Sequence, residues 1–242
     1  MTLDTDAAVQ PAGQPDVVAY THPRSPAAEA FRTLRTNIQF ASLDRPVRRL
    51  LFTSAGPDEG KSLVIANLAV TIAGAGGRVV VVDGDLRRPS QHEIFHLDNA
   101  RGLTNLFLAP RGADGAPALD LPLQATAVEN LWVLTSGPLP PNPAELLASH
   151  RMDEILRALD QRADYVLLDS PPVMAVTDAA VLSSKVDAVL LVVGAGVVKR
   201  ELARKAKAQL EAVRAPVLGL VVNNVPFDPT AFAGYYEMPA AQ

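Results

Sequence analysis

The stretch TSAGPDEGKS, residues 53–62, decides the fold of this chain. It overlaps the short apolar run RLLFTS (49–54), and a helical stretch follows at residues 61–74. A strand, a loop that ends in Gly60-Lys61-Ser62 and a helix start form the context that a Walker A phosphate-binding loop requires. Ala55 stands where the first glycine of that motif usually lies. The alternative is a chance Gly-Lys-Ser turn, which the order of strand, loop and helix disfavours.

The loop offers several ligands for phosphate. Successive backbone N–H groups would curl around the phosphates, and the helix N-terminus adds partial positive charge. Lys61 would place its ammonium on the β and γ oxygens, and the Ser62 hydroxyl would bind Mg²⁺. The loop residues predicted to bind the nucleotide are Ala55, Gly56, Pro57, Asp58, Glu59, Gly60, Lys61, Ser62 and Leu63.

Short apolar runs alternate with helical stretches along the rest of the chain. After the four-valine run at 79–82, apolar runs end at Leu134, Leu168, Val193 and Val222. Helical stretches are expected near residues 26–42, 61–74, 143–160, 176–184 and 199–213. This alternation predicts an α/β fold, in which a mostly parallel sheet carries helices on both faces in three α/β/α layers.

Two of the apolar runs end in aspartate. Asp83 follows the valine run and precedes Gly84 and Asp85, and the run YVLLD ends at Asp169. Ligands of open α/β sheets bind at the carboxyl ends of the strands. Asp169 would share Mg²⁺ with the serine of the loop, and the other two carboxylates could divide metal binding and proton acceptance. The alternative is that these aspartates only cap helices or turns.

The composition is that of a globular protein and excludes several classes of function. The 242 residues suffice for one α/β domain, with 48% hydrophobic and 20% charged residues. A formal net charge of −4 provides no basic field for nucleic acid. The absence of cysteine excludes disulfides and thiol chemistry. No apolar run approaches the ~18 residues that span a bilayer, so we expect no direct membrane insertion.

Three segments are predicted. Residues 1–24 are rich in proline and are expected to form a flexible N-terminal arm. Residues 25–226 would form the P-loop domain, which opens with a helix that Ser25 and Pro26 start. Residues 227–242 would form a flexible tail that bears Tyr235 and Tyr236.

Four motifs, in this order, resemble the bacterial tyrosine autokinases, or BY-kinases, of capsule and exopolysaccharide synthesis. They are SPAAEAFRTLRTNI (25–38), the Walker A loop (55–62), VVDGDLRRP (81–89) and the Walker B segment DYVLLDSPP (164–172). The segment SGPLPPNPAELL (136–147) is also similar. The resemblance covers about residues 25–225. It implies a P-loop NTPase fold related to the MinD/ParA ATPases, and an ATP- and Mg²⁺-dependent protein tyrosine autokinase that regulates polysaccharide polymerisation and export.

The resemblance also implies roles for individual residues. Lys61 and Ser62 would bind phosphate and Mg²⁺, and Asp85 and Asp169 would help to hold the metal. Asp83 would accept the proton of the incoming tyrosine hydroxyl.

Asn223 follows the last apolar run, where this superfamily reads the edge of the adenine base. A side-chain amide can donate and accept at once, which suits that role. The alternative is a turn formed by the pair Asn223-Asn224.

Assembly is the next implication. Glu29, Arg32 and Arg35 match the Glu-x-x-Arg-x-x-Arg pattern with which the family docks neighbouring subunits into a ring. The alternative is a solvated charged stripe. The resemblance further implies an activator, a membrane-spanning polysaccharide co-polymerase expected here as a separate chain. It would recruit this cytoplasmic protein to the inner face of the plasma membrane.

The chain departs from the family in its tail. Family tails carry several tyrosines that are phosphorylated in trans, whereas this tail has only Tyr235 and Tyr236, which could instead pack the tail onto the body. The alternative function is therefore that of a MinD/ParA-like ATPase, a nucleotide-driven assembly switch without significant kinase activity. Such ATPases carry an extra lysine where this chain has Gly56, which disfavours that alternative.

Overall fold

The fold is built on one seven-stranded sheet. The computed structural model describes residues 15, 17–43, 45–108 and 119–226. Across the sheet the strands follow the order β3-β4-β2-β5-β1-β6-β7, and every neighbouring pair is parallel except β3 with β4. The strands are β1 (Arg49–Ser54), β2 (Val79–Asp83), β3 (Gln124–Ala125), β4 (Leu131–Leu134), β5 (Tyr165–Asp169), β6 (Ala188–Gly194) and β7 (Val217–Asn223).

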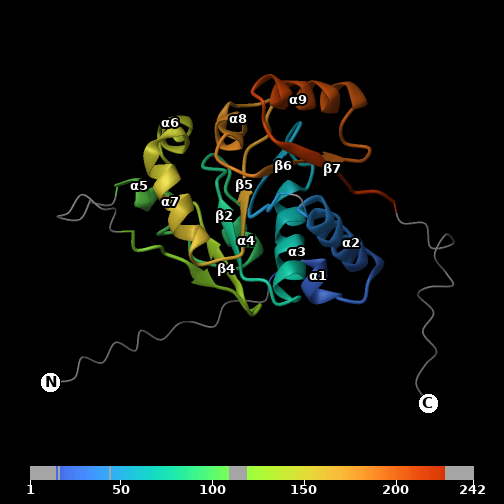
Figure 1. The fold of residues 1–242 in the computed structure, drawn as a ribbon, viewed down its shortest axis with the longest axis horizontal. Coiled ribbons are helices and arrows are strands. Elements are labelled where there is room, and N and C mark those ends of the chain that lie inside the picture. Colours follow the sequence, from blue (N-terminus) through green and yellow to red (C-terminus); the bar gives the residue numbers. More distant parts are fainter. Residues whose placement is uncertain (1–14, 16, 44, 109–118, 227–242) are drawn as a thin grey trace, which may run out of the picture.

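Helices cover both faces of this sheet (Figure 1). One face carries α1 (Val18–Thr21), α2 (Pro26–Ala41), α3 (Lys61–Ala73) and α4 (Gln91–Ile94). The other carries α5 (Leu103–Leu108), α6 (Pro143–Ala148), α7 (His150–Asp160), α8 (Asp178–Ser183) and α9 (Arg200–Ala212). Each set of helices packs against its own hydrophobic core. The predicted three-layer α/β/α fold is confirmed.

The central strands explain why the sheet forms. All five residues of β2 are buried, as are five of the six in β1, because helices cover them on both faces. By contrast β7 lies at the edge of the sheet, and its Leu220 and Val222 are exposed. The valine run in β2 therefore has the composition of a strand that is buried on two sides.

The strand register brings the acidic strand ends together. β2 and β5 pair so that Asp83 lies opposite Asp169, and Phe52 of β1 flanks Asp169 on its other side. Gly84 then crosses β5 so closely that a Cβ at this position would lie 2.6 Å from the carbonyl oxygen of Asp169. Glycine is required at that crossing.

Several elements differ from the predicted ones. The helix expected near 143–160 is two helices, since Ser149 adopts an extended conformation between α6 and α7. α4 and α5 were not predicted. Within the range assigned to a flexible arm, residues 18–21 form α1, and Val17 is only 2% exposed. The predicted helix start is confirmed, because the Ser25 side chain accepts a hydrogen bond from the Ala28 N–H at 3.2 Å.

Among the helices of the described residues, none has both the length and the hydropathy that a bilayer span needs.

Candidate active site

A pocket of about 400 Å³ opens over the loop between β1 and α3. The predicted nucleotide-binding residues 56–63 all line it, together with Ser54, Asp85, Arg88, Ser90, Ile94 and Pro172. Ala55 does not, because it is buried in the core at 1% exposure. α3 begins at Lys61, so the amide-rich N-terminus of a 13-residue helix borders the pocket. The predicted loop therefore has the geometry of an anion cradle.

Lys61 contacts Asp169 at the floor of this pocket. Its ammonium forms an ion pair with Oδ1 of Asp169, which is fully buried, and lies 3.2 Å from the Ser62 hydroxyl. This carboxylate is the ion-pair partner of the lysine. The pair joins the Walker A loop to the end of β5.

Gln91, which was not predicted, completes that contact. Its Nε2 donates to Asp169 Oδ2 at 2.7 Å and to the Ser62 carbonyl at 3.2 Å, and the residue is fully buried. Nothing in the residue pattern distinguishes this glutamine from a surface residue. It reaches the site because α4 starts there, immediately after the loop of residues 84–90.

Asp83 lies beneath the pocket rather than in its wall. It is fully buried, and its Oδ2 accepts hydrogen bonds from Ser90 N (3.0 Å) and Gln91 N (2.9 Å). Its Oδ1 has no hydrogen-bond partner among the described residues. Burial, followed by the neighbouring charge of Asp169, raises the pKa of Asp83 to about 8.

Of the three predicted strand-end aspartates, Asp85 is the one that lines the pocket. Its Oδ1 accepts from the backbone N–H groups of Arg87 (3.2 Å) and Arg88 (2.9 Å), and it remains 7% exposed. Burial raises its pKa above the ordinary aspartate value. The Arg88 side chain is exposed beside it, so a cation lies at the mouth of the pocket.

The donor set fits Mg²⁺ that arrives with a phosphate. No group of three or more His, Cys, Asp or Glu in the described part of the chain could hold a metal by itself. Ser62 and Asp85 line the same pocket, and Asp169 lies beneath it next to Lys61. Mg²⁺ in nucleotide enzymes takes one or two carboxylates and completes its shell with phosphate oxygens and water.

The side chains of Glu59 and Asn223, two of the residues predicted to bind the nucleotide, contact other parts of the protein. The Glu59 carboxylate, 1% exposed, accepts hydrogen bonds from the N–H groups of Gly56 and Gly194. Asn223 Nδ2 donates to the Glu59 carbonyl at 3.0 Å. At Gly60, where φ is +77°, a Cβ would lie 2.2 Å from that same Nδ2. Residues at the ends of β6 and β7 therefore hold the phosphate-binding loop through their hydrogen bonds with Glu59.

Asn223 also borders a second pocket, which is largely apolar. This pocket of about 740 Å³ lies between α2 and the end of β7, and Phe31, Leu34 and Val64 contribute to its wall. It adjoins the phosphate-binding loop through Asn223, which contacts Glu59.

The predicted assembly residues lie on α2 and contact their own chain. Arg32 forms an ion pair with Glu29 and donates to the Pro23 carbonyl. Arg35 donates to the Thr71 carbonyl of α3 at 3.1 Å. The predicted acceptors Tyr235 and Tyr236 lie outside the described residues.

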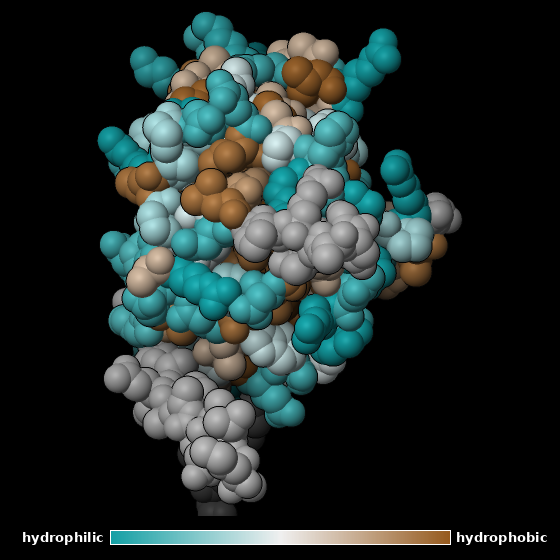
Figure 2. All heavy atoms as spheres, turned by 90° about the vertical axis from the view of Figure 1, so that its left-hand side faces the viewer, coloured by the Kyte–Doolittle hydropathy of each residue, from teal (hydrophilic) through white to brown (hydrophobic). Residues whose placement is uncertain are grey.

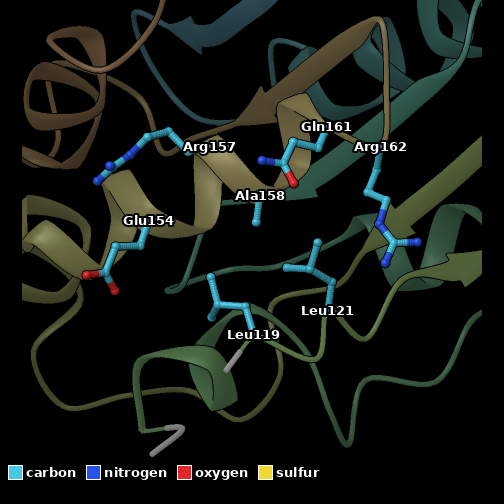
Figure 3. A pocket seen from close by; sticks show the side chains of 7 residues that line it. All are labelled: Leu119, Leu121, Glu154, Arg157, Ala158, Gln161 and Arg162. Carbon is cyan, nitrogen blue, oxygen red and sulfur yellow. The ribbon is translucent and has the colours of Figure 1, made fainter. Parts of the chain in front are cut away.

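A third pocket, on the outer side of α7, has no comparable chemistry (Figure 3). Leu119 and Leu121 face Ala158 across it, and the guanidinium groups of Arg157 and Arg162 point away from each other. The two cations therefore do not converge on one ligand. The side of the molecule where α5, α6 and α7 lie is mostly hydrophilic, and its hydrophobic atoms form separate patches (Figure 2).

Comparisons with known proteins agree with this geometry. A sequence model of the ParA family, described as NUBPL iron-transfer P-loop NTPase, matches residues 49–231. The tyrosine-protein kinase YwqD of Bacillus subtilis (strain 168) is 42% identical over 223 residues, which are 92% of each chain. The putative tyrosine-protein kinase CapB of Staphylococcus aureus is 40% identical over 90% of this chain and 93% of its own.

The similar solved structures also include a tyrosine kinase domain. The chimerical protein CapA2B2 superposes with a TM-score of 0.80 at 39% identity, over 87% of this chain and 90% of its own. The kinase domain of the Escherichia coli tyrosine kinase ETK gives 0.82 at 32% identity, over 90% and 84%. MinD of Pyrococcus horikoshii OT3, solved with Mg-ADP, gives 0.58 at 20% identity over 77% and 76%, a likeness of fold alone.

Proposed function

The chain belongs to the bacterial tyrosine-protein kinases, whose domain is a ParA/MinD-like P-loop NTPase, and on this premise we propose that it transfers the γ-phosphoryl group of Mg·ATP to protein tyrosine. One observation carries the proposal. Lys61, Ser62 and Asp85 meet in one pocket at a helix N-terminus, and Asp169 lies at its floor. This arrangement suits phosphoryl transfer, in which catalysis is mostly positioning and electrostatic stabilisation.

Each residue has a task in that reaction. The amides of residues 56–62 would bind the phosphates, while Lys61 turns from Asp169 to the β and γ oxygens. Ser62, Asp85 and Asp169 would hold Mg²⁺, which neutralises charge on the transferring group when it is bound. The adenine base would enter the apolar pocket beside Asn223.

Proton acceptance is the least direct of these tasks. We predicted Asp83 as the base, but its pKa, raised to about 8, leaves it protonated at neutral pH, so it must lose that proton before it can accept another. Its full burial means that a tyrosine hydroxyl could reach it only if the loop of residues 84–90 moved. Asp85 lines the pocket and is the carboxylate that such a hydroxyl would meet first.

The biological setting is a proposal that rests on the resemblance of the sequence motifs to the BY-kinases. We propose that the kinase phosphorylates Tyr235 and Tyr236 of neighbouring copies within a ring, through the charged residues of α2. We further propose that it controls the polymerisation and export of a capsular or extracellular polysaccharide. A membrane-spanning co-polymerase in a separate chain would activate it and recruit it to the inner face of the plasma membrane.

Mass spectrometry of the tail tests the central step. After incubation with Mg·ATP, we expect phosphate on Tyr235 or Tyr236 in the native chain and none in Lys61→Met. The substitution removes the ammonium that contacts the β and γ oxygens. Nucleotide turnover with an unmodified tail, in the presence of the activator, would instead support the assembly-switch ATPase.

A further inference from the structure

Arg87, in the middle of the loop of residues 84–90, forms an ion pair with α8. Its guanidinium forms a two-pronged ion pair with Asp178, with Nε–Oδ2 at 2.9 Å and Nη2–Oδ1 at 3.0 Å. Asp178 is the first residue of α8 and is fully buried, whereas the Arg87 side chain is 40% exposed. Such forked pairs fix the direction of both partners.

The same loop residue holds Asp85 through its backbone. Asp85 Oδ1 accepts hydrogen bonds from the N–H groups of Arg87 and Arg88. The ends of the loop are fixed separately, since Gly84 N donates to the Asp169 carbonyl and Ser90 N donates to Asp83. In the middle of the loop, Leu86 is buried in the core that it shares with α8, and the ion pair with Asp178 is the polar anchor beside it, next to the amides that orient Asp85.

The two arginines of the loop have different surroundings. Arg87 is bound to a buried carboxylate, so its charge is neutralised within the protein. Arg88 lines the pocket, with its side chain exposed. Of the two arginines, Arg87 is the one that joins the loop to α8 within the described part of the chain.

We propose that the Arg87–Asp178 ion pair is a positioning device that holds Asp85 in the orientation that Mg²⁺ requires. The inference rests on the proposed function, because it assumes that Asp85 helps to hold the metal of Mg·ATP. Arg87 does not contact the nucleotide in this scheme. Its effect reaches the metal through the two amides on Asp85 Oδ1.

The experiment measures nucleotide affinity by calorimetry, with Mg²⁺ and with EDTA, for the full chain. In Arg87→Gln we expect the Mg²⁺-dependent gain in ADP affinity to fall by about 10-fold to 100-fold, as for other groups that orient metal ligands. Affinity in EDTA should stay within about 2-fold of the native chain, because the phosphate-binding loop is untouched. Arg87→Lys should give an intermediate loss, since lysine keeps the charge without the fork.

Arg78 supplies the matched control. It forms the same kind of forked ion pair, with Asp164. Arg78 immediately precedes β2 and Asp164 immediately precedes β5, so this pair lies at the starts of the two strands, whereas the pocket lies at their carboxyl ends. Arg78→Gln should leave both affinities unchanged. A double variant, Arg87→Gln with Asp178→Asn, leaves no unpaired buried charge and covers the case in which Arg87→Gln does not fold.

The outcomes separate the two proposals. If the native chain shows no Mg²⁺-dependent gain, the proposed function itself is wrong. If that gain is present and the folded Arg87 variants retain it, the positioning role is wrong. Equal losses with Mg²⁺ and with EDTA would also overturn it, because they would indicate damage to the whole pocket.

Discussion

At the scale of single residues, Asp83 is a carboxylate whose ionised form is disfavoured by burial. It is fully buried and has one oxygen without a hydrogen-bond partner among the described residues. Its pKa of about 8 in the folded chain lies well above the ordinary value of 3.8. Between these two pH values the folded chain keeps a proton that the unfolded chain has released. The nucleotide-free protein therefore loses stability as the pH rises through this window.

Asp83→Asn should remove this dependence. Asparagine keeps an acceptor oxygen for Ser90 N and Gln91 N but carries no charge at any pH. We compare the free energy of unfolding of the variant with that of the native chain at each pH. The difference, variant minus native, should increase by on the order of a few kcal/mol from pH 5 to pH 8. Urea denaturation in EDTA, without nucleotide, measures it.

Asp164→Asn is the control for that comparison. The Asp164 side chain is half-buried, and its hydrogen bonds with Arg78 lower its pKa, so it stays ionised above pH 5 in both states. Its stabilising effect is lost only when the pH falls through its lowered pKa. The difference in the free energy of unfolding between Asp164→Asn and the native chain should stay constant from pH 5 to pH 8. A flat difference for Asp83→Asn as well would contradict the assignment.

The residues of the candidate site were predictable from the sequence to different degrees. Lys61, Ser62 and Asp85 could be predicted because each belongs to a local motif that follows a strand, and they do line one pocket. Gln91 could not, because its place beside Asp169 depends on where α4 starts after the loop. Glu59 was predicted as a member of the phosphate-binding loop, but the sequence did not indicate that its carboxylate accepts hydrogen bonds from two amides of the protein.

At the scale of elements, the ends of β6 and β7 support the phosphate-binding loop. The Glu59 side chain joins the start of the loop, at Gly56, to Gly194 at the end of β6. Asn223 at the end of β7 contacts the Glu59 carbonyl. These contacts fix the loop from outside, so its amides can be in place before phosphate binds.

Glu59→Gln should weaken this support. A carboxylate accepts from both N–H groups, whereas an amide can accept with only one oxygen and would point its NH₂ at the other donor. We expect a loss of about 1–3 kcal/mol of stability, the cost of a buried unsatisfied group, and weaker ADP binding with or without Mg²⁺. Thermal unfolding and calorimetry measure the two effects.

Asp58→Asn makes the same chemical change in the adjacent residue of the loop. Asp58 is exposed, so the substitution should alter the free energy of unfolding by no more than about 0.5 kcal/mol. Equal effects at the two positions would mean that Glu59 acts through its charge alone rather than through its contacts with Gly56 and Gly194.

The elements themselves were predictable to different degrees. The buried strands and the long helices α2, α3 and α9 have clear apolar patterns or start signals. The break between α6 and α7 at Ser149 was missed because the surrounding residues continue a helical pattern. α1 was missed because its support is tertiary: the Ala19 N–H donates to Asn67 of α3 at 2.8 Å.

At the scale of the whole molecule, charge links the tail to assembly. The chain carries a formal net charge of −4. A phosphate on each of Tyr235 and Tyr236 would add about −1.5 to −2 per group, which brings each copy to roughly −7 to −8. Copies arranged in the proposed ring would then repel one another over distances of about 10 Å at moderate salt.

Phosphorylation should therefore loosen the assembly. We expect native mass spectrometry to show fewer complete rings for the phosphorylated chain than for the same chain kept unmodified. A variant with Tyr235→Phe and Tyr236→Phe, incubated with Mg·ATP, should keep its rings, since it binds nucleotide but gains no tail charge. The difference should shrink as the ammonium acetate concentration rises, because salt screens repulsion between exposed charges. Equal ring occupancy of the phosphorylated chain and the phenylalanine variant at low salt would show that tail charge does not control assembly.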